Sequence, residues 1–156
     1  MAVAVGAGMG LDRQERGFAE LTLGGFLYPP LRAALDDYEQ DPIAVARRFI
    51  GAPYFWGGRE ATGLDCSALV QAALVACGFA CPRDSDMQQA ALGQITDKPA
   101  YGDLVFWKGH VGFIVGDNVL LHANAHHMAV AEEPFDEACG RIQAAGGGAV
   151  TAIKRL

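Results

Sequence analysis

The 156-residue chain contains few charged residues and no cluster of lysine or arginine. Charged residues make up 19% of the sequence, and the formal net charge at pH 7 is −6. Nucleic acids and anionic membrane surfaces are bound by basic patches, because their phosphate groups are negative. The sequence therefore predicts neither a nucleic-acid partner nor a membrane partner, and it leaves the oligomeric state open.

Long apolar runs are also missing, although hydrophobic residues form 51% of the chain. No stretch approaches the roughly 20 apolar residues that a membrane-spanning helix needs. Residues 1–10 are apolar and rich in glycine but lack the basic region of a secretory signal peptide, and Asp12 follows them closely. We therefore expect a globular, cytoplasmic protein, with export by another route left open.

The chain has only four cysteines, Cys66, Cys77, Cys81 and Cys139, which is too few for a dense disulfide framework at this length. No paired CxxC or HxxxH spacing indicates a zinc site. We expect no metal and no other cofactor. Cys77 and Cys81 are interpreted as core or near-surface thiols, whereas Cys66 has a setting that suits chemistry.

Cys66 stands at the start of a long apolar segment. Residues 67–76 contain no charge and no helix breaker before Gly78, which predicts a buried helix that ends at this glycine. Asp65 is the predicted N-cap, so Cys66 takes the first helical position. Unpaired backbone N–H groups and the helix dipole there favour a thiolate and lower the pKa of the thiol. The alternative is that Cys66 is a small hydrophobic core residue.

The remaining sequence predicts helices first and strands later. Residues 1–15 show no periodic pattern, residues 16–28 predict a hairpin about Gly24 and Gly25, and residues 31–40 form a connector. Asp41 and Pro42 are typical of a helix start. Further predicted elements are helices over 44–50, 86–92 and 134–145, and strands over 103–107, 111–115, 119–123, 128–131 and 150–154. Because the first four of these strands follow one another through short turns, they predict an antiparallel meander.

All four histidines fall in the strand region, and the register decides which of them can meet. A three-residue loop over 116–118 would set Gly112 opposite His122 and His110 opposite Asn124. His110 and His122 would then be diagonal neighbours on one face, with Cβ atoms about 7–8 Å apart. A two-residue turn would put the two histidines on opposite faces. In the first case either His122 or Asn124 orients His110 as a base.

These segments resemble the NlpC/P60 family of cysteine peptidases, which act on bacterial cell-wall peptides. The matching pieces occur in the family's order and at similar spacing, and they are PYFWGG (53–58), DCSALV (65–70), PRDSDMQ (82–88), GDLVFWKGHVGFI (102–114) and LLHANAHH (120–127). The resemblance covers residues 41–156 and implies an α+β, papain-like fold, in which a buried helix bearing the nucleophile packs against an antiparallel β-sheet. Residues 1–40 resemble the end of a bacterial SH3-like barrel followed by the connector.

The resemblance implies a Cys-His-His triad, with Cys66 as nucleophile, His110 as general base and His122 as the orienting residue. Asn124 remains the alternative orienting residue. The usual substrate of the family is the bond between γ-D-glutamate and a diamino acid, often diaminopimelate, in murein stem peptides.

The resemblance implies that Tyr54 lies near the thiol and that Asp65 and Ser67 meet the substrate's free amine and backbone. Arg83, Ser85 and Lys108 complete the expected peptide contacts. We hypothesise that Asp65 pairs with the free amine of the peptide, while Arg83 or Lys108 meets a carboxylate. Two other functions fit the same motifs. One is a module that binds wall peptides without cleaving them, and the other is a papain-like acyltransferase or amidase.

Overall fold

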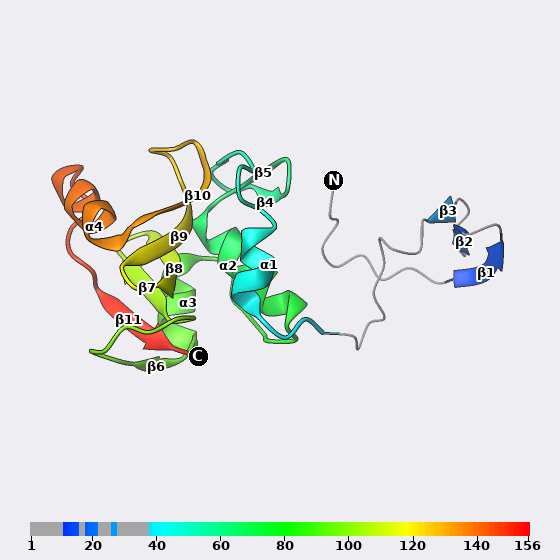
Figure 1. Cartoon of the computed structure of the whole chain (residues 1–156), viewed down its shortest axis with the longest axis horizontal. Helices are drawn as coiled ribbons and strands as arrows, with labels where there is room; N and C mark the ends of the chain where they lie inside the picture. The colour runs from blue at the N-terminus through cyan, green and yellow to red at the C-terminus, as the bar shows by residue number, and fades with distance from the viewer. Residues whose placement is uncertain (1–10, 16–17, 22–25, 28–37) are drawn as a thin grey trace.

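We describe a computed structural model of the chain, in which residues 11–15, 18–21, 26–27 and 38–156 are defined (Figure 1). Strands β1 (Leu11–Glu15), β2 (Phe18–Leu21) and β3 (Phe26–Leu27) form a small antiparallel sheet in the order β1-β2-β3. The pairing of β2 with β3 confirms the predicted hairpin strands, whereas β1 lies where no strand was expected. The predicted glycine turn and most of the connector lie outside the described residues. The relation of residues 1–40 to an SH3-like barrel stays a prediction.

The rest of the chain carries the helices and the main sheet. Its elements, in chain order, are α1 (Pro42–Arg47), β4 (Arg59–Glu60), β5 (Gly63–Leu64), α2 (Cys66–Ala76), α3 (Ser85–Ala91), β6 (Gln94–Ile95), β7 (Leu104–Trp107), β8 (His110–Gly116), β9 (Val119–Asn124), β10 (Ala129–Pro134), α4 (Phe135–Ala144) and β11 (Ala152–Arg155). The predicted helices and longer strands are confirmed with shifts at their ends. The two-residue strands β4, β5 and β6 were missed because two residues are too few to show an alternating pattern.

The main sheet has the strand order β10-β9-β8-β7-β11-β6, and its neighbouring strands run antiparallel. Helices cover both of its faces, so that α2 and α1 lie on one side and α4 on the other (Figure 1). Alternate residues of each central strand enter one of two cores: Phe106 and Phe113 pack with α2, whereas Val105 and Leu120 pack with α4. These features confirm the α+β class and the buried helix against an antiparallel sheet.

Helix α2 forms because its sequence supplies both a start and a stop. The side chain of Asp65 accepts a hydrogen bond from the backbone N–H of Ala68 at 2.9 Å, which is an N-cap contact. At the other end Gly78 has φ +81°, a left-handed conformation that costs glycine little. Between the two, Leu69 and Leu74 are fully buried. The predicted start, stop and burial of this helix are confirmed.

The β8–β9 hairpin corrects the predicted turn but keeps the predicted register. Gly116 pairs with Val119, so the loop has two residues rather than the expected three. The register then shifts between Ile114 and Gly116, because Val115 is an extra residue on β8, and Ile114 pairs with Leu120. This bulge compensates for the shorter loop. It thereby returns the histidines of β8 and β9 to one face of the sheet.

Gly112 confirms this register from the packing. A Cβ atom added to Gly112 would lie 3.0 Å from the Cβ of His122, so the glycine directly faces this histidine.

No helix in the described part of the chain is both long and apolar enough to cross a bilayer.

Candidate active site

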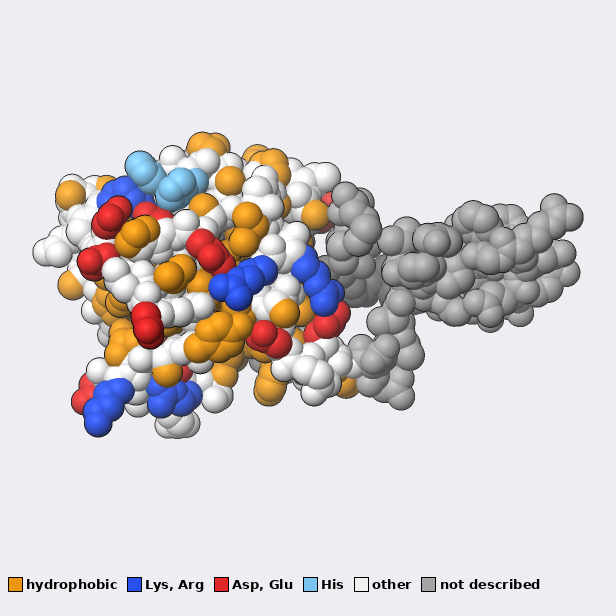
Figure 2. Space-filling view, in the orientation of Figure 1, with side chains coloured by type: hydrophobic (Ala, Val, Ile, Leu, Met, Phe, Trp, Pro, Cys, Tyr) orange, Lys and Arg blue, Asp and Glu red, His pale blue; other side chains and the backbone are white. Residues whose placement is uncertain are grey.

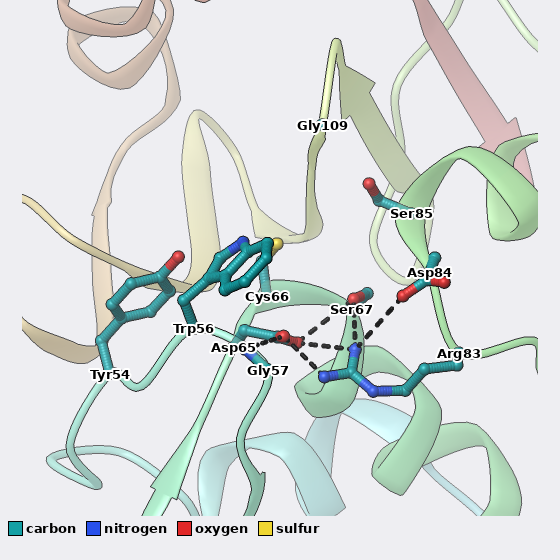
Figure 3. Close-up of a pocket in the computed structure, with 10 residues that line it drawn as sticks. All are labelled: Tyr54, Trp56, Gly57, Asp65, Cys66, Ser67, Arg83, Asp84, Ser85 and Gly109. Atoms are coloured by element: carbon teal, nitrogen blue, oxygen red, sulfur yellow. Dashed lines mark hydrogen bonds and ion pairs between the residues drawn. The ribbon is translucent and has the colours of Figure 1, made fainter.

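A pocket of about 490 Å³ opens at the N-terminal end of α2 (Figure 3). Its lining residues are Tyr54, Trp56, Gly57, Asp65, Cys66, Ser67, Arg83, Asp84, Ser85 and Gly109. Six of these were predicted as site residues from the sequence. The predicted residue Lys108 is exposed in the β7–β8 turn and does not line the pocket. Trp56, Asp84 and the two glycines were missed, although they stand in the matched segments.

Cys66 is the first residue of α2, and 6% of its surface is exposed. Burial raises the pKa of its thiol to about 11. The backbone N–H groups of Val111, Ser67 and Cys66 itself act to lower this pKa, but their effect is smaller. The expectation of a lowered pKa was wrong for the resting site, because loss of hydration outweighs the N–H groups of the helix start. The Cys66 thiol is therefore neutral at rest.

The position of the thiol relative to His110 follows from the neighbours of this histidine. Gly109 and Cys66 line the same pocket, and the backbone N–H of Val111 forms a hydrogen bond to the thiol that acts to lower its pKa. His110 lies between these two residues at the start of β8. The thiol thus comes from the helix on one face of the sheet, and it meets the sheet where β8 begins.

His110 and His122 are in direct contact. Nε2 of His110 lies 2.7 Å from Nδ1 of His122, and the ring centroids are 5.0 Å apart. The His122 ring is fully buried, and its Nε2 lies 2.6 Å from Oε1 of Glu133. Burial lowers the pKa of each histidine to about 3, and neighbouring His122 and Arg141 act in the same direction on His110. Both rings are therefore neutral at rest.

Asn124, the alternative orienting residue, is engaged elsewhere. Its Oδ1 accepts a hydrogen bond from the backbone N–H of His127 at 2.8 Å, and it lies 3.0 Å from Nδ1 of the same residue. These contacts close the turn that follows β9. In the structure His122, and not Asn124, is the residue in contact with His110, while the role of either as the orienting residue stays a prediction.

Asp65 and Arg83 form an ion pair with each other (Figure 3). The guanidinium donates to Oδ2 at 2.6 Å and to Oδ1 at 2.9 Å, and it also donates to the Ser67 hydroxyl at 2.8 Å. Burial acts to raise the pKa of Asp65, but Arg83 and the backbone N–H groups of Ala68 and Gly57 outweigh it and hold the pKa below its ordinary value. Each charge is already balanced by the other. The hypothesis that Asp65 takes the substrate's amine, while Arg83 or Lys108 meets a carboxylate, stays a prediction.

The face of the molecule in Figure 2 mixes acidic, basic and apolar side chains, and histidines gather in one place on it. His126 and His127 are exposed, and their ring centroids lie 4.8 Å apart. Within the described ranges, no group of three or more His, Cys, Asp or Glu side chains is arranged to hold a metal ion.

Taken together, a helix that starts with a cysteine and a sheet that presents paired histidines define a papain-like thiol site. The model of the NlpC/P60 family matches residues 51–140. The chain belongs to this family of cysteine peptidases.

Known relatives agree with this assignment. The chain is 38% identical over 93 residues to a gamma-D-glutamyl-L-lysine dipeptidyl-peptidase of Bacillus subtilis, covering 54% of this chain and 31% of the relative. It resembles the structure of an NlpC/P60 family protein from Bacillus cereus with a TM-score of 0.73 and 24% identity, over 94% of this chain and 53% of that one. The peptidoglycan hydrolase RipB from Mycobacterium tuberculosis gives a TM-score of 0.60 and 28% identity, over 73% of this chain and 62% of RipB. The chain spans between about a sixth and two fifths of the length of the curated relatives it matches.

Proposed function

We propose that the chain is a cysteine endopeptidase that hydrolyses the bond between γ-D-glutamate and a diamino acid in murein stem peptides. The observation that carries the proposal is the arrangement around the pocket. Cys66 stands at a helix start and its thiol is bonded by the backbone N–H of Val111, while Nε2 of the preceding residue, His110, lies 2.7 Å from Nδ1 of His122. The name of the Bacillus subtilis relative, a gamma-D-glutamyl-L-lysine dipeptidyl-peptidase, supports this choice of bond.

The proposed reaction begins with proton transfer. Because Nε2 of His110 is held by His122, Nδ1 is the nitrogen left to take the proton of the Cys66 thiol. Since burial keeps both groups neutral at rest, the proton moves as the sulfur attacks the γ-carbonyl carbon. The C–S bond forms, and the carbonyl electron pair moves onto oxygen.

The proposed tetrahedral intermediate places its oxyanion at the helix start. The backbone N–H groups there, including that of Cys66, stabilise this negative charge. Collapse breaks the C–N bond, and His110 returns its proton to the departing amine. Water, activated by the same histidine, then hydrolyses the thioester and restores the thiol.

The proposed contacts of the peptide's amine and carboxylate groups follow from how exposed the charged side chains near the pocket are. The side chain of Asp84 is 66% exposed, lines the pocket and lies 4.0 Å from Arg83, whereas Asp65 is 9% exposed and is bonded by Arg83 through both of its oxygens. We assign the peptide's free amine to Asp84 for this reason. Lys108, exposed in the turn before Gly109, is the cation assigned to a substrate carboxylate. Tyr54 and Ser85 supply hydroxyl groups to the same pocket.

Incubation with L-Ala-γ-D-Glu-diaminopimelate tests the proposal. Mass spectrometry should show L-Ala-D-Glu and free diaminopimelate with the wild type and no products with Cys66→Ala. A matched peptide with L-lysine in place of diaminopimelate tests the choice of diamino acid. Intact peptide in both incubations, together with tight binding of the peptide, would instead support a binding module. The raised pKa of the Cys66 thiol is the observation that favours this second candidate.

Acyl transfer is tested in the same incubation. Adding an amine acceptor diverts the thioester into a new amide if the enzyme is an acyltransferase. A hydrolase gives free L-Ala-D-Glu at an unchanged rate.

A further inference from the structure

Behind the two histidines lies a carboxylate that the proposed triad does not include. Glu133 is on β10, and only 10% of its side chain is exposed. Its Oε1 lies 2.6 Å from Nε2 of His122. Arg141, from α4, donates a hydrogen bond to the same oxygen. Three side chains from β9, β10 and α4 therefore meet at one carboxylate oxygen.

This contact determines where the protons of both histidines sit. A carboxylate that pairs with a guanidinium can only accept hydrogen bonds, so Nε2 of His122 must carry the hydrogen. Nδ1 of the neutral His122 ring then has a lone pair and accepts a hydrogen bond. Its partner, Nε2 of His110, must in turn be the donor. The remaining nitrogen of His110, Nδ1, is left with the lone pair that a base needs.

We propose that Glu133, held in place by Arg141, is a positioning residue that fixes the tautomers of His122 and His110 so that Nδ1 of His110 is the base. The inference rests on the proposed function, and it extends the triad to a chain of four side chains: Cys66, His110, His122 and Glu133. No residue of the matched motifs pointed to Glu133, because it lies beyond the last matched segment, which ends at His127.

The chain of hydrogen bonds also serves the charged stage of the reaction. When His110 takes the thiol proton, its ring becomes a cation, and its Nε2–H continues to donate to His122. His122 keeps its own hydrogen on Nε2 and donates it to Glu133, so no second proton changes place. The negative charge of Glu133 favours the cation on His110, whereas Arg141 opposes it. His126 and His127 are the other titratable groups that face this cluster.

The neighbouring residue Glu132 provides a matched control. Glu132 is also an acidic residue of β10, and it also pairs with an arginine, since Nε of Arg47 lies 2.8 Å from its Oε1. Successive residues of a strand point to opposite faces, so Glu132 lies on the side away from His122. Glu132→Gln therefore removes an acidic charge and an ion pair from the same strand without touching the histidines.

The experiment compares three variants with the wild type: Glu133→Gln, the double variant Glu133→Leu/Arg141→Met, and the control Glu132→Gln. The double variant removes both charges, so that no unpaired arginine destabilises the fold. We expect the double variant to lower kcat by about 10- to 100-fold, as for other residues that orient a catalytic ligand. KM should change less than about twofold, because Glu133 does not line the pocket. Glu133→Gln keeps an acceptor oxygen and should restore part of kcat, and Glu132→Gln should match the wild type.

Nitrogen-15 NMR of labelled histidine gives a readout that needs no substrate. The wild type and Glu132→Gln should show the hydrogen of His122 on Nε2, and the double variant should show a population with the hydrogen on Nδ1. A wild-type His122 with its hydrogen on Nδ1 would overturn the inference. So would a double variant with the wild-type kcat, or one in which kcat falls while the tautomers stay unchanged.

The two readouts separate this inference from the proposed function. If the wild type does not cleave the peptide but the tautomers respond to Glu133, the proposed function fails and the positioning role stands. If the wild type cleaves and the Glu133 variants behave like Glu132→Gln in both readouts, the positioning role fails and the function stands. Circular dichroism identifies a variant that has not folded, and Glu133→Gln then serves as the test.

Discussion

The two faces of the main sheet contribute opposite halves of the candidate site, and they do so by different means. On the α2 face, the thiol of Cys66 is placed by the helix start, which depends on Asp65 one residue away. On the α4 face, the imidazole of His110 is placed by pairing with His122, twelve residues along the chain. Local sequence thus positions the candidate nucleophile, whereas strand register positions the candidate base. A change in register should damage the second half and leave the first intact.

Replacement of His122 tests the base half without changing the backbone. We expect His122→Ala to lower kcat/KM by about 10²- to 10⁴-fold, the range for loss of a group that orients a general base. Asn124→Ala is the control, because Asn124 lies on the same strand but is bonded to His127. A larger loss with Asn124→Ala than with His122→Ala would reverse the roles of the two residues. Steady-state kinetics with the stem peptide measure both.

The pH dependence of alkylation tests the nucleophile half. Since the pKa of the Cys66 thiol is raised to about 11, the thiolate fraction should grow about tenfold per pH unit across the neutral range. The rate of iodoacetamide labelling should rise in the same way. Parallel labelling of Cys66→Ala subtracts the contributions of Cys77, Cys81 and Cys139. A rate that is already high and constant from mildly acidic pH upward would show a thiolate stabilised by His110, contrary to the neutral pair described above.

Removal of the Asp65 charge tests whether the helix start is also a source of stability. Asp65→Asn breaks the ion pair with Arg83, whose side chain is only 23% exposed, and it also weakens the N-cap of α2. We therefore expect the free energy of unfolding to fall by about 1–3 kcal/mol. The pKa of Asp65 is lowered in the folded chain, so its contribution is present above the ordinary value of 3.8 and is lost as the pH falls through the folded value.

Urea unfolding at neutral and at acidic pH measures this effect. The difference between the wild type and Asp65→Asn should be largest at neutral pH and should shrink at acidic pH. Asp86→Asn, an exposed aspartate of α3, is the control and should change the unfolding free energy little. A difference that grows on acidification would contradict the lowered pKa.

The smallest expected effect concerns the rim of the pocket. Asp84→Asn should raise KM several-fold for a peptide with a free amine and leave KM for its N-acetylated form unchanged, because an exposed charge pair contributes little. An equal change in KM for the two peptides would show that Asp84 does not bind the amine.

The sequence was sufficient wherever neighbouring residues carry the signal. The N-cap, the apolar helix and the glycine stop of α2 all lie within residues 65–78, and each was predicted correctly. The main strands were found for the same reason, because their alternating pattern is local. The turn between β8 and β9 was predicted with three residues and has two, yet the predicted register is correct. The bulge at Val115 supplies the extra residue that the loop lacks.

By itself, the sequence determined the family, the fold class and the identity of the candidate nucleophile and base, because short motifs and periodic patterns carry that information. Only the tertiary structure decided that Arg83 neutralises Asp65, that Glu133 supports His122, and that the Cys66 thiol is neutral at rest. The physical reason is that partners distant in the chain set these ion pairs, and that loss of hydration in a packed core depends on every neighbour at once. Neither can be read from residues adjacent in sequence.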